Sequence, residues 1–333
     1  MYIPRRFEPF LRWTNQKFKA KKLFRMEQQH GILVLNKPKG LSSAQCLSRI
    51  KRLGQKKIGH AGTLDPMATG VLIVMLGHAT KLSNYLLEGG VKTYGGTLRL
   101  GVTTDTWDAE GSIVAESPLS AEDLAPGSAL EQAARSDIAA WLDVKEQPVP
   151  PYSAAKHQGQ PLYKLARAGM EVPQKVKQIE VSYADVQWVN MPDVRFRVTC
   201  SSGSYIRSLA HSLGIRLGCG AMLTELTREY SHPFGLDVSH TLDEILAEPE
   251  KLAEWVLPIS AALPAWKQIT ANARQEADLK NGIAVPHLPD FGDFQPGERA
   301  LIVARDGSPL ALTEARMDRD RPVWAVLRGL FTQ

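Results

Sequence analysis

The chain has 333 residues, more than the roughly 250–300 at which a single hydrophobic core stops growing, so at least two domains are expected. Hydrophobic residues make up 44% and charged residues 23% of the sequence, which is ordinary globular usage and excludes a disordered or fibrous chain. The formal net charge of +5 is a weak indication of an anionic partner.

The first feature along the chain is a basic N-terminal segment. Residues 1–30 contain eight basic and two acidic side chains, a balance of +6, and residues 31–333 contain 32 basic and 33 acidic ones, a balance of −1. We therefore predict a basic extension over residues 1–29, which is either an RNA contact or a disordered leader. The rest of the chain is nearly neutral.

Regular elements are predicted from residue 31 onward. A buried strand over 31–35 stops at a Lys-Pro-Lys-Gly turn, and Ser42 or Ser43 caps the helix that follows. A glycine-rich loop over 59–70 leads into an apolar strand over 71–76. The pattern then predicts, in order, a helix over 80–87, a strand over 92–100, an exposed helical insertion over about 117–147, strands over 176–188 and 194–200, a helix over 205–217, and a small, mostly β tail over 266–333 with strands over 300–304 and 323–327.

The loop over 59–70 is the most unusual stretch of the sequence. It contains four glycines, which allow close backbone approach to a ligand, and Asp65, which Pro66 restrains toward an extended conformation. An ionised aspartate is a competent nucleophile at neutral pH, although a local capping role for Asp65 is the alternative. His60 is the one histidine that stands out, with a purely structural role as its alternative.

Three further side chains could complete such a site. Arg207 lies on the first turn of a predicted helix and could orient a carboxylate, unless it is an ordinary solvated arginine. Tyr94 and Tyr205 could stack on a nucleobase, unless they only pack.

Other chemistries lack their motifs. There is no GxGxxG, P-loop, HExxH or GxSxG sequence and no paired metal-ligand spacing, so we expect neither a cofactor nor a metal. The three cysteines form no CxxC pair, the longest apolar run is far shorter than the roughly 20 residues of a membrane span, and no signal peptide begins the chain. A cytoplasmic protein without a membrane segment is expected.

Several long motifs, in order and in register, resemble the TruB family of pseudouridine synthases. The clearest are Asn36-Lys-Pro-Lys-Gly-Leu-Ser-Ser43 and Gly59-His-Ala-Gly-Thr-Leu-Asp-Pro-Met-Ala-Thr-Gly-Val-Leu72. The resemblance covers about residues 30–235 and continues through segments 85–94, 100–106, 147–156, 200–209, 217–223 and 226–228.

The resemblance implies a fold and a reaction. The fold is α/β of the α+β type: a pseudouridine synthase domain over 30–260 with a mixed, mainly antiparallel sheet, and a PUA-like RNA-binding domain over 266–333. The reaction is the isomerisation of the T-loop uridine at position 55 of tRNA, with base flipping and without a cofactor. The implied partner is the tRNA T stem-loop, and the protein is expected to be a monomer.

The resemblance also assigns roles to residues. The catalytic set is Asp65, its partner Arg207, and Tyr94 stacked on the target base. Whether Asp65 attacks C6, attacks C1′ or assists elimination is left open. The implied substrate-binding residues are His60, which enters the T loop, Leu226, which walls the base, and Lys37, Gly62, Thr63 and Tyr205. The sequence departs from the family pattern at Ser202, Ser204, His211, Ser212 and Thr227.

Two other functions fit parts of this pattern. A non-catalytic tRNA-binding or tRNA-folding protein would need the basic segment and the tail but would have no use for Asp65, Arg207 and Tyr94 together. A related synthase directed to rRNA, or guided by RNA within a complex, fits less well with a self-contained chain of this length.

Overall fold

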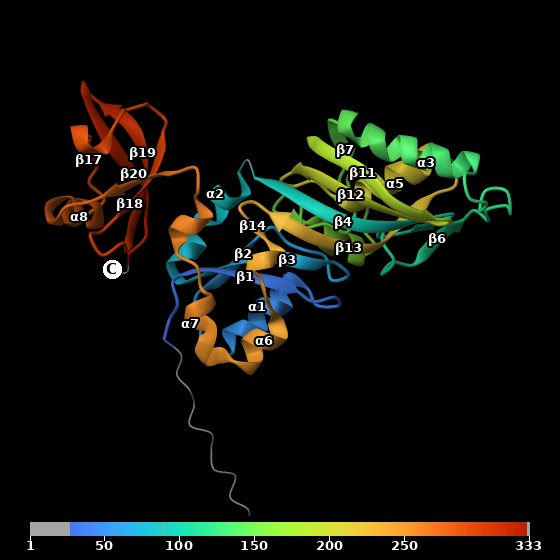
Figure 1. The fold of residues 1–333 in the computed structure, drawn as a ribbon, viewed down its shortest axis with the longest axis horizontal. Coiled ribbons are helices and arrows are strands. Elements are labelled where there is room, and N and C mark those ends of the chain that lie inside the picture. The colour runs from blue at the N-terminus through green and yellow to red at the C-terminus, as the bar shows by residue number, and fades with distance from the viewer. Residues whose placement is uncertain (1–26, 89, 332–333) are drawn as a thin grey trace, which may run out of the picture.

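The computed structural model describes residues 27–88 and 90–331 (Figure 1). All but the last three residues of the predicted basic extension over 1–29 lie outside this part. Within the described residues, no helix is both long and apolar enough to cross a membrane.

A large, twisted sheet forms the centre of the molecule. Its strands in spatial order are β11 (Val181–Asn190), β12 (Asp193–Ser201), β4 (Val91–Leu100), β13 (Ala221–Ser231), β3 (Thr69–Leu76), β1 (Gly31–Lys37) and β15 (His240–Thr241), while β2 (Ile58–Ala61) pairs with β3 and β14 (Phe234–Gly235) with β13. Neighbouring strands are antiparallel except for β13 with β3 and β1 with β15. The predicted mixed, mainly antiparallel sheet is confirmed.

Strand β3 is buried on both faces, which explains its unbroken apolar sequence. Leu72, Val74 and Leu76 belong to the principal core, whereas Val71, Ile73 and Met75 belong to a second core on the opposite face. The side chains of β1 divide between the two cores in the same way. These two strands therefore form a wall between the cores.

Helix α1 (Ser43–Lys51) follows β1 as predicted. The Ser42 hydroxyl accepts a hydrogen bond from the backbone of Gln45, and the Gln45 side chain accepts one from the backbone of Ser42, which completes a capping box. Cys46, Leu47 and Ile50 form its buried face. Local sequence signals are sufficient to determine this helix.

The insertion predicted over 117–147 is shorter and better packed than expected. Its helical part is α3 (Ala129–Ala139) followed by η2 (Ala140–Asp143). Ala134, Ile138 and Trp141 are fully buried in the principal core, and the Trp141 ring meets Phe196 of β12 edge-on at 5.0 Å. Most residues of the segment are exposed, as predicted, but its apolar face is buried because it covers the sheet (Figure 1).

Two other predictions need small corrections. The loop predicted over 59–70 begins inside β2, and the single strand predicted over 176–188 is divided into β10 (Val176–Gln178) and β11. The remaining elements of this part are η1 (Gly77–Leu82), α2 (Ser83–Leu87), β5 (Val102–Thr104), β6 (Ile113–Glu116), β7 (Glu146–Pro148), β8 (Lys156–His157), β9 (Gln160–Pro161), α4 (Leu162–Arg167), α5 (Ile206–Arg216), η3 (Leu236–Val238), α6 (Leu242–Ala247), η4 (Pro249–Lys251), α7 (Leu252–Trp255) and η5 (Ile259–Ala262).

The C-terminal residues form a separate β-rich domain, coloured red in Figure 1. Its strands in spatial order are β16 (Lys267–Thr270), β18 (Arg299–Val303), β19 (Pro309–Asp318), β20 (Arg321–Gly329) and β17 (Val285–Pro286), accompanied by α8 (Ala273–Lys280) and η6 (Pro289–Phe291). Trp324 is fully buried in its core. Leu301, Val303, Leu312 and Leu330 instead join the second core behind β1 and β3.

Candidate active site

Asp65 lies in the loop between β2 and β3, and both of its neighbours are fixed. The Ser43 hydroxyl, at the start of α1, donates to the carbonyl of Leu64 at 3.1 Å and accepts from the Leu64 amide at 2.9 Å. The Pro66 carbonyl accepts from the Gly40 amide at 2.8 Å and from the Lys37 ammonium at 3.2 Å. The turn and helix that precede this loop in the sequence thus hold the backbone on both sides of the carboxylate.

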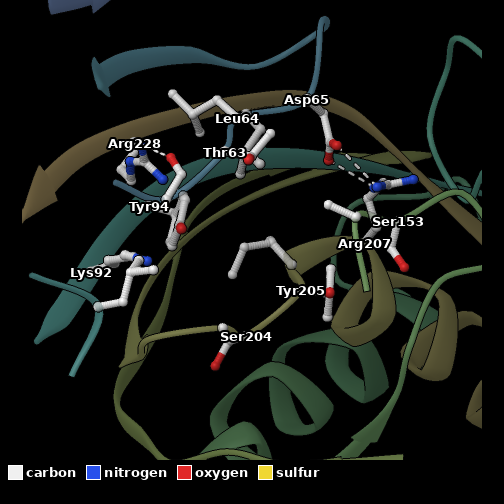
Figure 2. Close-up of a pocket in the computed structure, with 16 residues that line it drawn as sticks. Thr63, Leu64, Asp65, Lys92, Tyr94, Ser153, Ser204, Tyr205, Arg207 and Arg228 are labelled. Carbon is white, nitrogen blue, oxygen red and sulfur yellow. Dashed lines mark hydrogen bonds and ion pairs between the residues drawn. The ribbon is translucent and has the colours of Figure 1, made fainter. Parts of the chain in front are cut away.

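The Asp65 carboxylate forms a two-point contact with Arg207. Nη2 of Arg207 donates to Oδ1 at 3.1 Å, and Nε lies 2.9 Å from Oδ2 (Figure 2). The Arg207 side chain is 4% exposed, whereas that of Asp65 is 36% exposed. A buried cation therefore orients a carboxylate that a ligand can still reach.

Arg207 is itself held by groups that the sequence analysis did not identify. It donates to the carbonyls of Thr106 at 2.8 Å and Tyr152 at 3.0 Å, and Nη1 lies 3.4 Å from Oδ2 of the buried Asp108. Burial raises the pKa of Asp108, although Arg207 and a 2.6 Å hydrogen bond from Thr106 oppose the rise. These contacts exclude the alternative of a solvated helix arginine.

The pair opens onto a cavity of about 220 Å³. Its wall comprises Gly62, Thr63, Leu64, Asp65, Leu87, Lys92, Tyr94, Ser153, Ala154, Gly203, Ser204, Tyr205, Ile206, Arg207, Leu226 and Arg228. Seven of the nine predicted site residues are in this wall. Burial raises the pKa of Tyr94 and of Tyr205, so that their phenols stay protonated at neutral pH.

Two predicted residues lie outside the wall. Lys37 is fully buried, and its ammonium donates to the carbonyls of Pro38, Leu41 and Pro66. His60 lies half-buried on β2, where desolvation, and then the charge of Arg228, lower its pKa. The structure thus brings the three predicted catalytic residues together with most of the predicted substrate-binding residues. Lys37 lies beneath the loop that carries Asp65, and His60 lies beside it.

Two cations of the wall, Lys92 and Arg228, were missed as site residues. Side chains alternate along a strand, so Lys92 shares a face of β4 with Tyr94, and Arg228 shares a face of β13 with Leu226. Arg228 is fully buried and donates to the carbonyls of Val71 at 2.7 Å and Gly62 at 2.9 Å. Their spacing of two residues from a predicted site residue on the same strand is the signal that could have identified both cations. No comparable signal in the sequence pointed to Asp108.

The departures from the family pattern are accommodated locally. The Thr227 hydroxyl lies 2.8 Å from that of Thr69 across the parallel pair β13–β3, and the His211 ring stacks on Trp107 at 4.2 Å. The Ser202 hydroxyl donates to the Gly90 carbonyl, while Ser204 belongs to the cavity wall. Among the residues described, no three His, Cys, Asp or Glu side chains are grouped in a way that could hold a metal ion.

Comparison with known proteins agrees with this architecture. The chain shares its fold with a chain of a Cbf5-Nop10-Gar1 complex (TM-score 0.62, 24% identity, covering 91% of this chain and 85% of that one). It also shares its fold with a chain of an H/ACA RNP bound to a substrate RNA containing 2'-deoxyuridine (TM-score 0.61, 23% identity, covering 91% and 86%). Relatives with the name tRNA pseudouridine synthase B match nearly the whole chain, so the chain is a pseudouridine synthase, an isomerase.

Sequence comparison identifies the family. Residues 50–206 match the family described as TruB family pseudouridylate synthase (N terminal domain). The chain is 60% identical over 309 residues to tRNA pseudouridine synthase B of Nitratidesulfovibrio vulgaris (strain Miyazaki F), covering 92% of this chain and 98% of the relative. It is 57% identical over 310 residues to that of Oleidesulfovibrio alaskensis, covering 92% and 98%. The chain belongs to the TruB family.

Proposed function

We propose that this chain converts the T-loop uridine at position 55 of tRNA to pseudouridine, and that Asp65, Arg207 and Tyr94 carry the reaction. The observation that carries the proposal is the two-point contact of Arg207 with an accessible Asp65 at the wall of a closed-in cavity. The 60% identity to a tRNA pseudouridine synthase B supports tRNA as the substrate.

The reaction is an isomerisation in which all atoms are kept. The bond from C1′ to N1 breaks, the uracil turns within the cavity, and a bond from C1′ to C5 forms while C5 loses a proton and N1 gains one. Asp65 acts on C6 of the uracil, on C1′ of the ribose, or by assisting elimination. Each route needs an ionised carboxylate held beside the target nucleotide. Arg207 supplies that orientation, and exclusion of water strengthens the pairing.

The remaining wall residues provide a place for a flipped base. Extruding the uridine costs a few kcal/mol of unstacking, and stacking on an aromatic ring recovers about 1–3 kcal/mol per base. Tyr94 lies beneath the base, while Leu226 and Tyr205 close the wall, supported by the burial of Tyr94 and Leu226 and by the place of all three in the cavity wall. Gly62 and Thr63 form the backbone edge, and His60, on the adjacent strand, enters the T loop where the uridine has left.

Lys37 acts in this proposal by holding the loop, since its three acceptors include the carbonyl next to Asp65. Over a larger range, residues 30–260 form the catalytic domain and residues 266–333 a PUA-like domain that contacts the tRNA, with residues 1–29 as a basic extension. The protein acts as a monomer in the cytoplasm and needs no metal.

The decisive experiment replaces the carboxylate by an isosteric amide. Asp65→Asn should bind an unmodified tRNA transcript as wild type does, yet lower conversion by at least about 10⁴-fold, as removal of a nucleophile does in other enzymes. Tritium release from a transcript labelled at C5 of uridine measures the turnover. Asp137→Asn, at the surface ion pair with Arg216, should keep the wild-type rate.

The same assay can reject the proposal. Wild-type release that persists when position 55 is replaced by cytidine would exclude the target uridine. Turnover by Asp65→Asn would exclude the carboxylate. No release by the wild type, together with normal tRNA binding, would favour a non-catalytic tRNA-binding protein.

A further inference from the structure

Lys92 is a largely buried lysine whose ammonium has no acceptor among the described residues. Its side chain comes from β4, the residue is 7% exposed, and its ammonium donates no hydrogen bond to any described residue. Lys37, the other buried lysine of this region, donates to three carbonyls. A buried charge without a partner is costly, and a lysine ammonium has three protons to donate, so the donors of Lys92 are available for a ligand.

Lys92 and Arg228 converge on one point of the cavity wall. Gly62 has a positive φ of +77°, and a Cβ placed on it would lie 3.1 Å from Nζ of Lys92 and 3.4 Å from Nη1 of Arg228. The absence of a side chain at Gly62 therefore lets both cations approach the same stretch of backbone closely. In Figure 2 they lie on one side of the cavity and the Asp65–Arg207 pair on the other, with Tyr94 between them.

No acid neutralises this side of the cavity. Asp65 is the only acidic residue of the described wall, and it is paired with Arg207. The charged or titratable groups that face Lys92 are Arg228 on β13, Lys177 on β10 and Cys200 on β12, and burial raises the pKa of the Cys200 thiol to about 11, which keeps it neutral. Two gathered positive charges without an acid are the arrangement expected of an anion site.

We infer that Lys92 and Arg228 form an anion subsite that binds an RNA backbone phosphate adjacent to the flipped uridine. This inference rests on the proposed function, because a flipped nucleotide brings its own phosphodiester groups to the cavity. The base lies against Tyr94, and the phosphate lies on the cavity side of Lys92, which meets it as a point charge. Arg228 keeps its two carbonyl acceptors and contributes its positive charge.

The test combines a substitution at Lys92 with neutral replacement of single RNA phosphates and compares the effects on binding affinity. All proteins carry Asp65→Asn, so that no turnover occurs. The probe is a T stem-loop RNA, and single uncharged methylphosphonate linkages replace the phosphates on either side of the target uridine. Lys92→Met should weaken binding roughly 10- to 100-fold, the effect of losing one hydrogen bond to a charged group. One methylphosphonate should cause the same loss with Lys92 present and no further loss with Lys92→Met.

Charge and salt provide two further measurements. Lys92→Arg should recover most of the affinity. Lys92→Met should also flatten the plot of log affinity against log salt by about 0.7, the share of one phosphate in a single strand. Lys251→Met, which removes an exposed lysine paired with Glu248, should leave affinity and slope unchanged.

The pH dependence of binding gives a third measurement. Burial, aided by the charges of Arg228 and Lys177, lowers the pKa of Lys92 to about 8. A phosphate binds the protonated form, so affinity should be constant below pH 8 and fall as pH rises above it. Lys92→Met should abolish this fall.

Lys92→Met is expected to remain folded, so a loss of binding would not reflect a loss of stability. A lysine pKa lowered from 10.5 to about 8 gives stability that is full above 10.5 and is lost as pH falls through 8. Charged Lys92 thus opposes folding at neutral pH, and Lys92→Met should unfold at the same or a higher urea concentration.

Two results would overturn the inference. Wild-type affinity in Lys92→Met would exclude a phosphate contact. Additive losses from Lys92→Met and from each methylphosphonate would exclude direct contact. Because only binding is measured, a failure of the proposed isomerisation would appear separately, in the tritium assay.

Discussion

Two buried arginines on opposite sides of one cavity have different partners. Arg207 contacts two carboxylates, Asp65 and Asp108, as well as two carbonyls. Arg228 is equally buried but donates to the carbonyls of Val71 and Gly62 and contacts no acid among the described residues.

This difference shows how the two sides of one small cavity can differ in net charge. Around Arg207 the positive charge is met by the carboxylates of Asp65 and Asp108, so that side can hold a reactive carboxylate in a defined orientation. Around Arg228 and Lys92 the positive charge is unbalanced, so that side attracts an anion. The residue type alone does not distinguish these roles, whereas the partners do.

The largest effect should come from Arg207→Met, which removes the shared cation. Asp108 would then be a buried charge without a partner, and Asp65 would lose its orientation. We expect tRNA conversion to be abolished and the free energy of unfolding, measured in urea at pH 7, to fall by about 3–5 kcal/mol.

The matched control is Arg99→Met. Arg99 also pairs with a carboxylate, Asp193, at 2.8 Å, but its side chain is 45% exposed. That change should cost at most about 1 kcal/mol. Equal costs for the two variants would show that burial does not set the strength of the Arg207 contacts.

A smaller loss is expected for Arg228→Met. The change leaves two buried carbonyls without a donor, at roughly 1–3 kcal/mol each, but it also removes a cation that has no acid partner. We expect a net loss of about 1–3 kcal/mol in the same urea titration. A loss as large as that of Arg207→Met would break the comparison between the two arginines.

The smallest effect concerns pH and Asp108. A carboxyl pKa raised above its ordinary 3.8 means that the folded state binds the proton more tightly, so this contribution to stability is full below pH 3.8 and is lost as pH rises through the folded pKa. Asp108→Asn does not titrate. The variant should therefore gain stability relative to wild type between pH 3.8 and 7 in urea unfolding, and a relative loss over that interval would contradict the prediction.

Elements determined by local signals were predicted well from the sequence. Strand β1 and helix α1 follow from an apolar run, a turn and a serine cap, and all three signals lie within a few residues of the element that they set. The contact between Asp65 and Arg207 joins residues that are 142 positions apart. Local signals do not predict such a contact, and it was implied by the family resemblance.

The errors have a common physical cause. Acidic and alanine residues dominate the segment over 117–147, which was expected to be exposed, yet Ala134 and Ile138 of α3 and Trp141 of η2 are fully buried in the principal core. The roles of Asp108 and Lys92 depend on what faces them in space. A sequence shows that a residue is charged, but whether its charge is balanced depends on the tertiary fold.

The wall formed by β1 and β3 has a consequence for how the protein unfolds. Because Leu301, Val303, Leu312 and Leu330 of the C-terminal domain belong to the same core as Ile32, Val34 and Ile73, removing that domain would uncover part of the core that supports the strands carrying the Asp65 loop. The two domains should accordingly lose structure in one cooperative transition, and the catalytic domain alone is a poor substitute for the whole chain in any assay.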